Sequence, residues 1–275
     1  MTDPMKQLKR EEEFAGKRKR KAKNLALGIL GILSFLALWQ LVVEFELIDR
    51  RLIAGPSEVF WGLITKLYQP KPDGSLLFEH IKSSLIVALS GFALAVVIGV
   101  PLGLLMGWYQ PIDRLFGPVF EIIRPLPPIA WIPFAIIFLG IGLFAKSVII
   151  FLSAFIPCLI NSYTGIKLTN QIYINVAATC GASRWKTFCR VGVPSAMPMV
   201  FAGMRISLGN AWSTLVAAEM LAANKGLGYM ILMGRTFYKI DLIIGGMLVI
   251  GALGILFTSL FDRLERYVLR WRGVR

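Results

Sequence analysis

Long apolar runs without a charged residue constrain the fold of this chain more than any other feature. Five runs lack Asp, Glu, Lys and Arg altogether, and they cover residues 24–43, 83–112, 125–145, 147–166 and 242–261. Each is long enough to cross a hydrocarbon core of roughly 30 Å as a helix. A sixth segment, residues 191–218, is apolar except for Arg205. We therefore expect an all-α polytopic membrane protein with six transmembrane helices.

The composition agrees with a membrane protein, because 56% of the 275 residues are hydrophobic and only 17% are charged. The net charge of +14 could suggest a nucleic-acid partner. The basic residues, however, lie beside the apolar runs, where membrane proteins commonly carry them. We therefore expect membrane lipid, and no nucleic acid, to surround this chain.

The charges flanking the runs predict the topology. Residues 1–23 carry a dense cluster of Lys and Arg, whereas the loop after the first run mixes acidic and basic residues. By the positive-inside rule the N-terminus is cytoplasmic, and six spans return the C-terminus to the same side. We expect a retained first helix and one transmembrane domain, residues 24–266, between the basic segment 1–23 and a basic tail, residues 267–275.

The third apolar run holds four prolines, Pro125, Pro127, Pro128 and Pro133. We expect the first three to end a short amphipathic helix, residues 115–123, and to start the third span near Ile129, because proline is tolerated in the first turn of a helix. Pro133 then falls inside the span and frees a carbonyl group, which suggests a solute pathway, a hinge, or a kink used only for packing. Our pathway candidates in this run are Pro128, Trp131 and Pro133.

Small residues recur at four-residue spacing in the second run, at Gly91, Ala95, Gly99, Gly103 and Gly107. Such a stripe lets another helix approach closely. The spacing does not say whether that helix belongs to the same chain.

Side chains that could carry catalysis or bind a metal are few. The three cysteines, Cys158, Cys180 and Cys189, have no metal-binding spacing and are expected to be free thiols. The single histidine, His80, is expected to be a polar residue at the outer end of the second span. The stretch GIGLFAKS, residues 140–147, has the outline of a phosphate-binding loop but lacks its second glycine and a preceding cytosolic strand. We expect no metal, no ATP site and no enzymatic activity in this chain.

A cytoplasmic segment, residues 174–198, is predicted to form a helix, a turn and a second helix. Residues 175–180 favour a helix, Gly181 supplies a left-handed stop, and Ser183 can cap the helix that follows. Helical spacing would place three residues on one side of that second helix: Trp185, Phe188 and Cys189. An amphipathic helix on the membrane surface or a site for anionic lipid is the alternative interpretation.

The same segment resembles the EAA loop of ABC importer permeases, EAA-x3-G-x9-I-x-L-P. Gly181 and the VGVP stretch, residues 191–194, match its spacing, whereas the first two residues of the name-giving triplet are replaced by Asn175 and Val176. RPLPPIAWIPFAIIFLGIG and GMRISLGNAWSTLVAAEML also look like the nitrate, taurine and aliphatic sulfonate branch. The resemblance covers roughly residues 52–261.

This resemblance implies the fold of a type I ABC importer permease in the bacterial inner membrane. The implied partners are a second permease copy in a homodimer, two cytoplasmic ATPase subunits that bind ATP and Mg, and an extracytoplasmic solute-binding protein. The implied solute is a small anion resembling taurine, a sulfonate or nitrate. The implied coupling loop covers about residues 167–193, and its contact residues are Asn175, Ala177, Ala178, Gly181, Ala182, Ser183, Trp185, Phe188 and Pro194.

Within that loop the resemblance implies separate roles. Gly181 would set the angle of the coupling helix, Ala177 and Ala178 would allow close approach to an ATPase groove, and two aromatic residues would anchor the loop. Pro194 would redirect the chain into the fifth span.

Two charged residues of the fifth span are too far apart to pair within one helix. Arg205 lies ~15 Å along the helix from Ser195, and Glu219 lies ~21 Å beyond Arg205. A central charge is costly in lipid, so Arg205 should face protein or a cavity. It attracts an anionic solute, snorkels toward the cytoplasm, or bonds helix ends and the ATPase side of the bundle. The pathway candidates in this span are Arg205, Trp212, Ser213, Thr214 and Glu219.

A secondary transporter or channel that needs no ATPase is the alternative function. Such a protein usually carries its own ion or proton site at membrane depth. No acidic residue lies between Glu121 and Glu219, which weakens this alternative.

Overall fold

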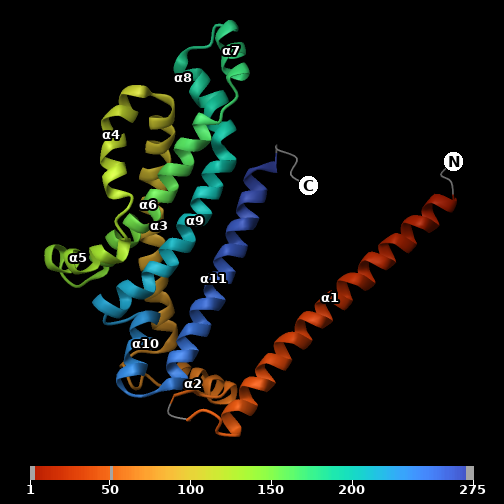
Figure 1. Cartoon of the computed structure of the whole chain (residues 1–275), viewed down its shortest axis with the longest axis vertical. Helices are drawn as coiled ribbons and strands as arrows, with labels where there is room; N and C mark the ends of the chain where they lie inside the picture. The colour runs from red at the N-terminus through yellow and green to blue at the C-terminus, as the bar shows by residue number, and fades with distance from the viewer. Residues whose placement is uncertain (1–3, 50–51, 271–275) are drawn as a thin grey trace. The chain divides into compact units, whose positions relative to one another are not determined.

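The computed structural model describes residues 4–49 and 52–270, without the side chains of residues 4–22, 25 and 222. Within these residues every regular element is a helix (Figure 1). The chain divides into two compact units, residues 1–62 and 63–275. Residues 1–3 of the basic N-terminal segment and residues 271–275 of the basic tail lie outside the described part.

The first unit contains one long helix, α1, which runs from Pro4 to Glu44. Its apolar part, Ala26–Glu44, has a mean hydropathy of 2.3 and confirms the first expected span. The helix α2, Pro56–Tyr68, begins in this unit. At its start the Gly55 N–H donates to Glu58 Oε2 at 3.0 Å, as in a capping box with proline at the first helical position.

The second unit is built around three packed helices, α3 (Leu77–Trp108), α6 (Leu143–Lys167) and α9 (Val193–Ala222). The glycine stripe of α3 faces α6. A Cβ atom at Gly91 would lie 2.7 Å from the Ile150 Cβ, and one at Gly107 would lie 2.8 Å from the Tyr163 carbonyl oxygen. The close partner of the stripe is therefore a helix of the same chain.

At the third span, the expected end of an amphipathic helix at residue 123 and the expected new start near Ile129 are both present, but the helix after the prolines does not continue to residue 145. The chain instead forms α4 (Gln110–Ile123), a 3-10 turn η1 (Pro128–Trp131) and α5 (Ile132–Leu139), and the two halves meet at 87°. At 1.5 Å per residue, α5 is only ~12 Å long and cannot cross the membrane alone. The prolines force the bend, and Gly140, at φ 74°, ends α5.

Three other spans are longer than their charge-free runs. The helix α6 begins before residue 147 and includes the buried Lys146. The fifth span starts at Arg184, because α8 (Arg184–Thr187), a π-helix η2 (Phe188–Gly192) and α9 follow one another without a break. The last helix, α11, covers Ile240–Val268. The described residues thus contain five helices able to span, or six if the bent pair counts as one span.

Short helices lie at the two ends of this unit. The helices α7 (Gln171–Thr179) and α8 lie at one end, and α10 (Leu227–Thr236) lies at the other (Figure 1).

Candidate coupling loop and solute pathway

The helix–turn–helix predicted after the fourth span is present, and its first helix is longer than expected. The helix α7 begins at Gln171 because Asn170 caps it, its side-chain oxygen accepting the Ile172 N–H at 2.9 Å. Gly181, at φ 74°, confirms the predicted left-handed stop. The Ala182 N–H donates to the Ala177 carbonyl and the Gly181 N–H to the Ala178 carbonyl, which is the bonding pattern of a Schellman motif.

The second helix also begins as predicted. Ser183 lies in extended backbone, and its hydroxyl oxygen accepts the Lys186 N–H at 3.3 Å. The turn between α7 and α8 is thus held by two local caps, one glycine and one serine. Both depend only on residues within a few positions of the turn.

The chain does not change direction at Pro194. A proline removes one backbone donor, and the π-helix η2 widens the turn just before it, with the Val193 N–H bonding to the Phe188 carbonyl. The helix therefore continues from α8 into α9. The expected redirection of the chain at Pro194 is wrong.

The expected grouping of three side chains on one side of the second helix is present for its two aromatic members. The ring centroids of Trp185 and Phe188 lie 5.3 Å apart. Phe188 is buried, whereas Trp185 and Cys189 are exposed.

Phe188 attaches the loop to the bundle through aromatic contacts. Its ring lies 5.6 Å from Trp108, 6.0 Å from Tyr109 and 5.3 Å from Trp185, measured between ring centroids. Trp108 also packs against Gly192, where an added Cβ would lie 2.9 Å from the indole. Gly192, the glycine of the VGVP stretch, thus leaves room for the Trp108 indole, against which Phe188 packs.

The outer surface of the loop carries exposed apolar side chains. Ile172, Tyr173, Val176 and Trp185 are each more than half exposed. Asn175, Lys186 and Arg190 are exposed as well. A rigid apolar surface with a basic rim is typical of a docking site for another protein.

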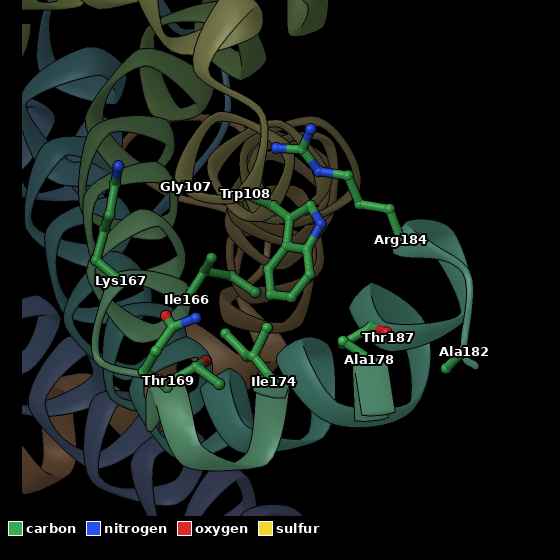
Figure 2. Close-up of a pocket in the computed structure, with 11 residues that line it drawn as sticks. Gly107, Trp108, Ile166, Lys167, Thr169, Ile174, Ala178, Ala182, Arg184 and Thr187 are labelled. Carbon is green, nitrogen blue, oxygen red and sulfur yellow. The ribbon is translucent and has the colours of Figure 1, made fainter. Parts of the chain in front are cut away.

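Two hollows flank the loop where it meets the bundle. The first, of about 460 Å³, lies between the ends of α3 and α6 and the inner side of α7 and α8. Trp108 occupies its centre, with Ile166 and Ile174 beside it and Arg184 above (Figure 2). The second, of about 750 Å³, is lined by Tyr173, Ala177 and Pro194. The implied coupling residues Ala178 and Ala182 line the first hollow and so lie on its inner side.

Arg205 lies midway along α9, and the structure gives it two acidic partners. Its guanidinium is 2.8 Å from Asp262 and also bonds Glu265, both on α11. All three side chains are partly exposed. Arg205 therefore joins two helices and has its charge neutralised, an arrangement that follows the helix-bonding interpretation.

The three polar pathway candidates after Arg205 have different surroundings. The Trp212 indole N–H donates to the Ile250 carbonyl at 3.1 Å, and Thr214 is buried against Ser153 at 2.7 Å. Ser213 alone of the three is exposed. In the bent third span, Pro128 and Trp131 are half-buried and Pro133 is exposed at the start of α5.

Glu219 lies at the far end of α9 from the coupling loop and is fully buried. Its carboxylate accepts hydrogen bonds from the Ser84 hydroxyl, at 2.7 and 2.9 Å, and from the Gly228 N–H at 2.9 Å. Its bonds join three helices rather than lining an open surface.

Sequence reasoning missed several residues at these sites. Asn170 follows the pattern of a helix cap and could have been found from that pattern. The aromatic platform of Trp108 and Tyr109 and the partners of Glu219 could not, because they come from distant parts of the chain.

Comparison with known proteins identifies the family. Residues 99–273 match the model of the binding-protein-dependent transport system inner membrane component. The chain belongs to this family. It is a permease subunit of an ABC importer and a multi-pass membrane protein, and a transporter or channel independent of an ATPase is not favoured.

Named relatives cover nearly the whole chain. The taurine transport system permease protein TauC of Escherichia coli (strain K12) is 33% identical over 91% of this chain and 90% of its own length. The bicarbonate transport system permease protein CmpB of Synechococcus elongatus (strain ATCC 33912 / PCC 7942 / FACHB-805) is 31% identical over 92% of both chains. A probable ABC transporter permease protein of Brucella abortus (strain 2308) is 34% identical over 90% of this chain and 96% of its own.

Solved structures show the same fold. The MetNI methionine ABC transporter in an inward-facing conformation aligns with a TM-score of 0.62, at 21% identity, over 70% of this chain and 95% of that one. This similarity confirms the expected type I importer fold.

Proposed function

We propose that two copies of this chain form the pore of an ATP-driven importer that moves a small anionic solute into the cytoplasm. The observation that carries this proposal is the exposed helix–turn–helix of α7 and α8. It is held rigidly by Asn170, Gly181 and Ser183, and it is attached to the bundle through Phe188. A loop that only joined two spans would need neither the caps nor the exposed apolar surface.

The partner on this surface is a cytoplasmic ATPase subunit, one for each permease copy. The exposed side chains suit an apolar groove with acidic residues at its edge, because Ile172, Val176 and Trp185 lie among basic residues. ATP and Mg bind to that subunit. This chain contributes the translocation pore and the coupling surface.

The solute is a small anion of the sulfonate, bicarbonate or nitrate class. Support for this class comes from the relatives named for taurine and bicarbonate transport. Arg205 does not add to it, because two carboxylates already neutralise its charge. An extracytoplasmic binding protein delivers the solute to the end of the bundle where α10 lies.

ATP-dependent uptake tests this function. The chain would be co-expressed with the ATPase subunit and the binding protein of the same importer, reconstituted in liposomes, and supplied with labelled taurine, bicarbonate and nitrate. We expect uptake of at least one of these to require both ATP and the binding protein. Uptake that proceeds without an ATPase would contradict the proposal.

The orientation has its own test, with both termini placed in the cytoplasm. The native Cys180 is exposed on the α7–α8 turn, and Ser57 lies at the start of α2. In a background without Cys158 and Cys189, an impermeant thiol reagent should reach Cys180 only after the cells are opened. With Cys180 also replaced, Ser57→Cys should react on intact cells. Labelling of both from outside would contradict this orientation.

A further inference from the structure

The start of α10 is capped by side chains that come from other helices. The first N–H groups of a helix have no partner inside it. At the start of α10 three successive amides, from the N-cap residue Gly226 onward, are satisfied from outside: the Gly226 N–H donates to His80 Nδ1 at 3.1 Å, the Leu227 N–H to Ser84 Oγ at 2.8 Å, and the Gly228 N–H to Glu219 Oε2 at 2.9 Å. The acceptors belong to α3 and α9.

Ser84 links two of these bonds. A serine hydroxyl has one proton to donate and two lone pairs that accept. Here it accepts the Leu227 N–H and donates its proton to the Glu219 carboxylate. Loss of this one hydroxyl would leave both an amide and a carboxylate short of a partner.

The carboxyl group of Glu219 suits its position. A helix N-terminus carries a partial positive charge that favours a carboxylate. A buried carboxyl group is costly unless it is hydrogen-bonded, and Glu219 has two kinds of donor, the Ser84 hydroxyl and the Gly228 N–H. The two kinds of donor therefore satisfy the buried Glu219 carboxyl group within the cap.

A second group of residues fixes His80. His80 Nδ1 accepts the Gly226 N–H, and its Nε2 lies 3.1 Å from Asp73 Oδ2. Asp73 also pairs with Lys66 of α2. Burial raises the Asp73 pKa, but the contacts with His80 and Lys66 outweigh it and lower that pKa to about 2, so Asp73 stays ionised.

The backbone at this cap has no room for a side chain. Gly226 has φ 139°, and a Cβ atom there would overlap the Glu219 carboxylate. A Cβ at Gly228 would lie 2.6 Å from the Val216 carbonyl oxygen. The turn into α10 is thus pressed directly against the acid that caps it.

We propose that Glu219 is a positioning residue for transport. With Ser84 and His80 it caps α10 from α9 and α3, and so makes the end of the bundle opposite the coupling loop move as one rigid gate. The apolar side of the same element supports this role, because Leu227 and Met230 are buried in a cluster with Leu77 of α3. The role of the cap in transport rests on the proposed importer function, whereas the cap itself does not.

Amide exchange tests the cap without reference to transport. In the assembled complex in lipid nanodiscs, Glu219→Gln should raise the hydrogen exchange rates of amides 226–228 at least ten-fold, and Ser84→Ala about five-fold, because each leaves buried groups unpaired. The matched control is Glu79→Gln. Glu79 pairs with Lys225 of the same turn at 3.1 Å, but both side chains are exposed, so exchange should change less than two-fold. Peptides covering α7 and α8 should be unaffected in all three variants.

Transport measurements test the positioning role. Glu219→Gln should lower uptake at least five-fold while the complex still hydrolyses ATP with an unchanged KM for the loaded binding protein, because the gate no longer follows the ATPase. Glu219→Asp, which keeps the charge, should recover part of the uptake. Glu79→Gln should transport normally. A purely structural role would instead lower membrane abundance, uptake and hydrolysis together.

Three outcomes would overturn the inference. Unchanged exchange at amides 226–228 in Glu219→Gln would exclude the cap. Faster exchange with normal uptake, or a parallel loss of abundance, uptake and hydrolysis, would reduce Glu219 to a structural residue. If Glu219→Gln does not accumulate, Ser84→Ala decides by the same measurements. A wild-type complex that takes up no solute would contradict the proposed function and would leave the exchange result standing.

Discussion

The two ends of the second unit differ in how the unpaired backbone groups at their helix ends are hydrogen-bonded. At the α7–α8 turn, the helix ends are satisfied by neighbours in the sequence, namely Asn170, Gly181 and Ser183, and the turn is exposed. At the start of α10, they are satisfied by buried side chains up to 146 positions away. A turn capped by its sequence neighbours keeps its shape when its surroundings change. A helix capped by side chains of other helices instead keeps its position relative to those helices. The first suits a docking surface, and the second suits a gate.

The largest expected effect is at the remote cap. Gly226→Ala would place a methyl group on the Glu219 carboxylate at a backbone angle that alanine rarely adopts. We expect a strong loss of folded permease, measured by fluorescence-detected size exclusion and thermal stability. Gly181→Ala is the matched control, since Gly181 has positive φ but open space around it. It should cost about 1 kcal/mol and leave abundance near normal; equal losses in both would break the contrast.

The next effect is at the local cap. Gly181→Val should leave the permease inserted but disconnect uptake from ATP hydrolysis, because a β-branched residue resists the left-handed turn that aims α8. Uptake should fall at least ten-fold, with weakened ATPase binding or hydrolysis no longer stimulated by the loaded binding protein. Gly31→Val is the control, because Gly31 lies inside α1 with open space and no special backbone angle. Normal uptake and stimulation in Gly181→Val would contradict the coupling assignment.

A moderate effect is expected at Arg205, where a long-range contact is exposed rather than buried. Arg205→Ala should lower uptake several-fold, because it leaves Asp262 and Glu265 without a partner. Arg205→Lys keeps the charge but loses the planar fork, so it should be milder. Both variants are to be compared at matched membrane levels. Wild-type uptake in both would show that remote contacts matter only where they are buried.

The smallest effect is expected at Ser183. Ser183→Ala removes one exposed cap worth roughly 0.5 to 2 kcal/mol. We expect stimulated hydrolysis and uptake to fall about two-fold, measured beside Ser183→Asn, which can still cap the helix. A loss as large as that of Gly181→Val would mean that Ser183 contacts the ATPase directly.

The contrast between the two ends also explains what could be predicted from the sequence. Gly181 and Ser183 were predictable because a stop and a cap act within one turn of the chain. His80 was expected only to be polar, and Glu219 was assigned to the pathway, because nothing local links them to the start of α10.

The spans show the same difference between features set by local sequence and features set by distant residues. Apolar composition predicted six membrane-crossing segments, and the prolines predicted the break after residue 123, but the 87° angle of that break and the early end of α5 before Gly140 were not predicted. The buried Lys146 was read as a gap between two spans, yet it lies inside α6. Whether a lysine can be buried inside a helix depends on residues that are distant in the sequence, so the sequence around Lys146 could not predict it.

The π-helix before Pro194 gives the importer a mechanical lever. Because η2 carries the helix past the proline, one continuous helical span of 38 residues runs from Arg184 to Leu221. At 1.5 Å per residue it is ~57 Å long. If one end of this span is held in place, a tilt of about 5° displaces the other end by about 5 Å, given a helical rise of 1.5 Å per residue. The docking helix and the acid that caps α10 stand at opposite ends of this span, so a small rotation at one becomes a displacement at the other.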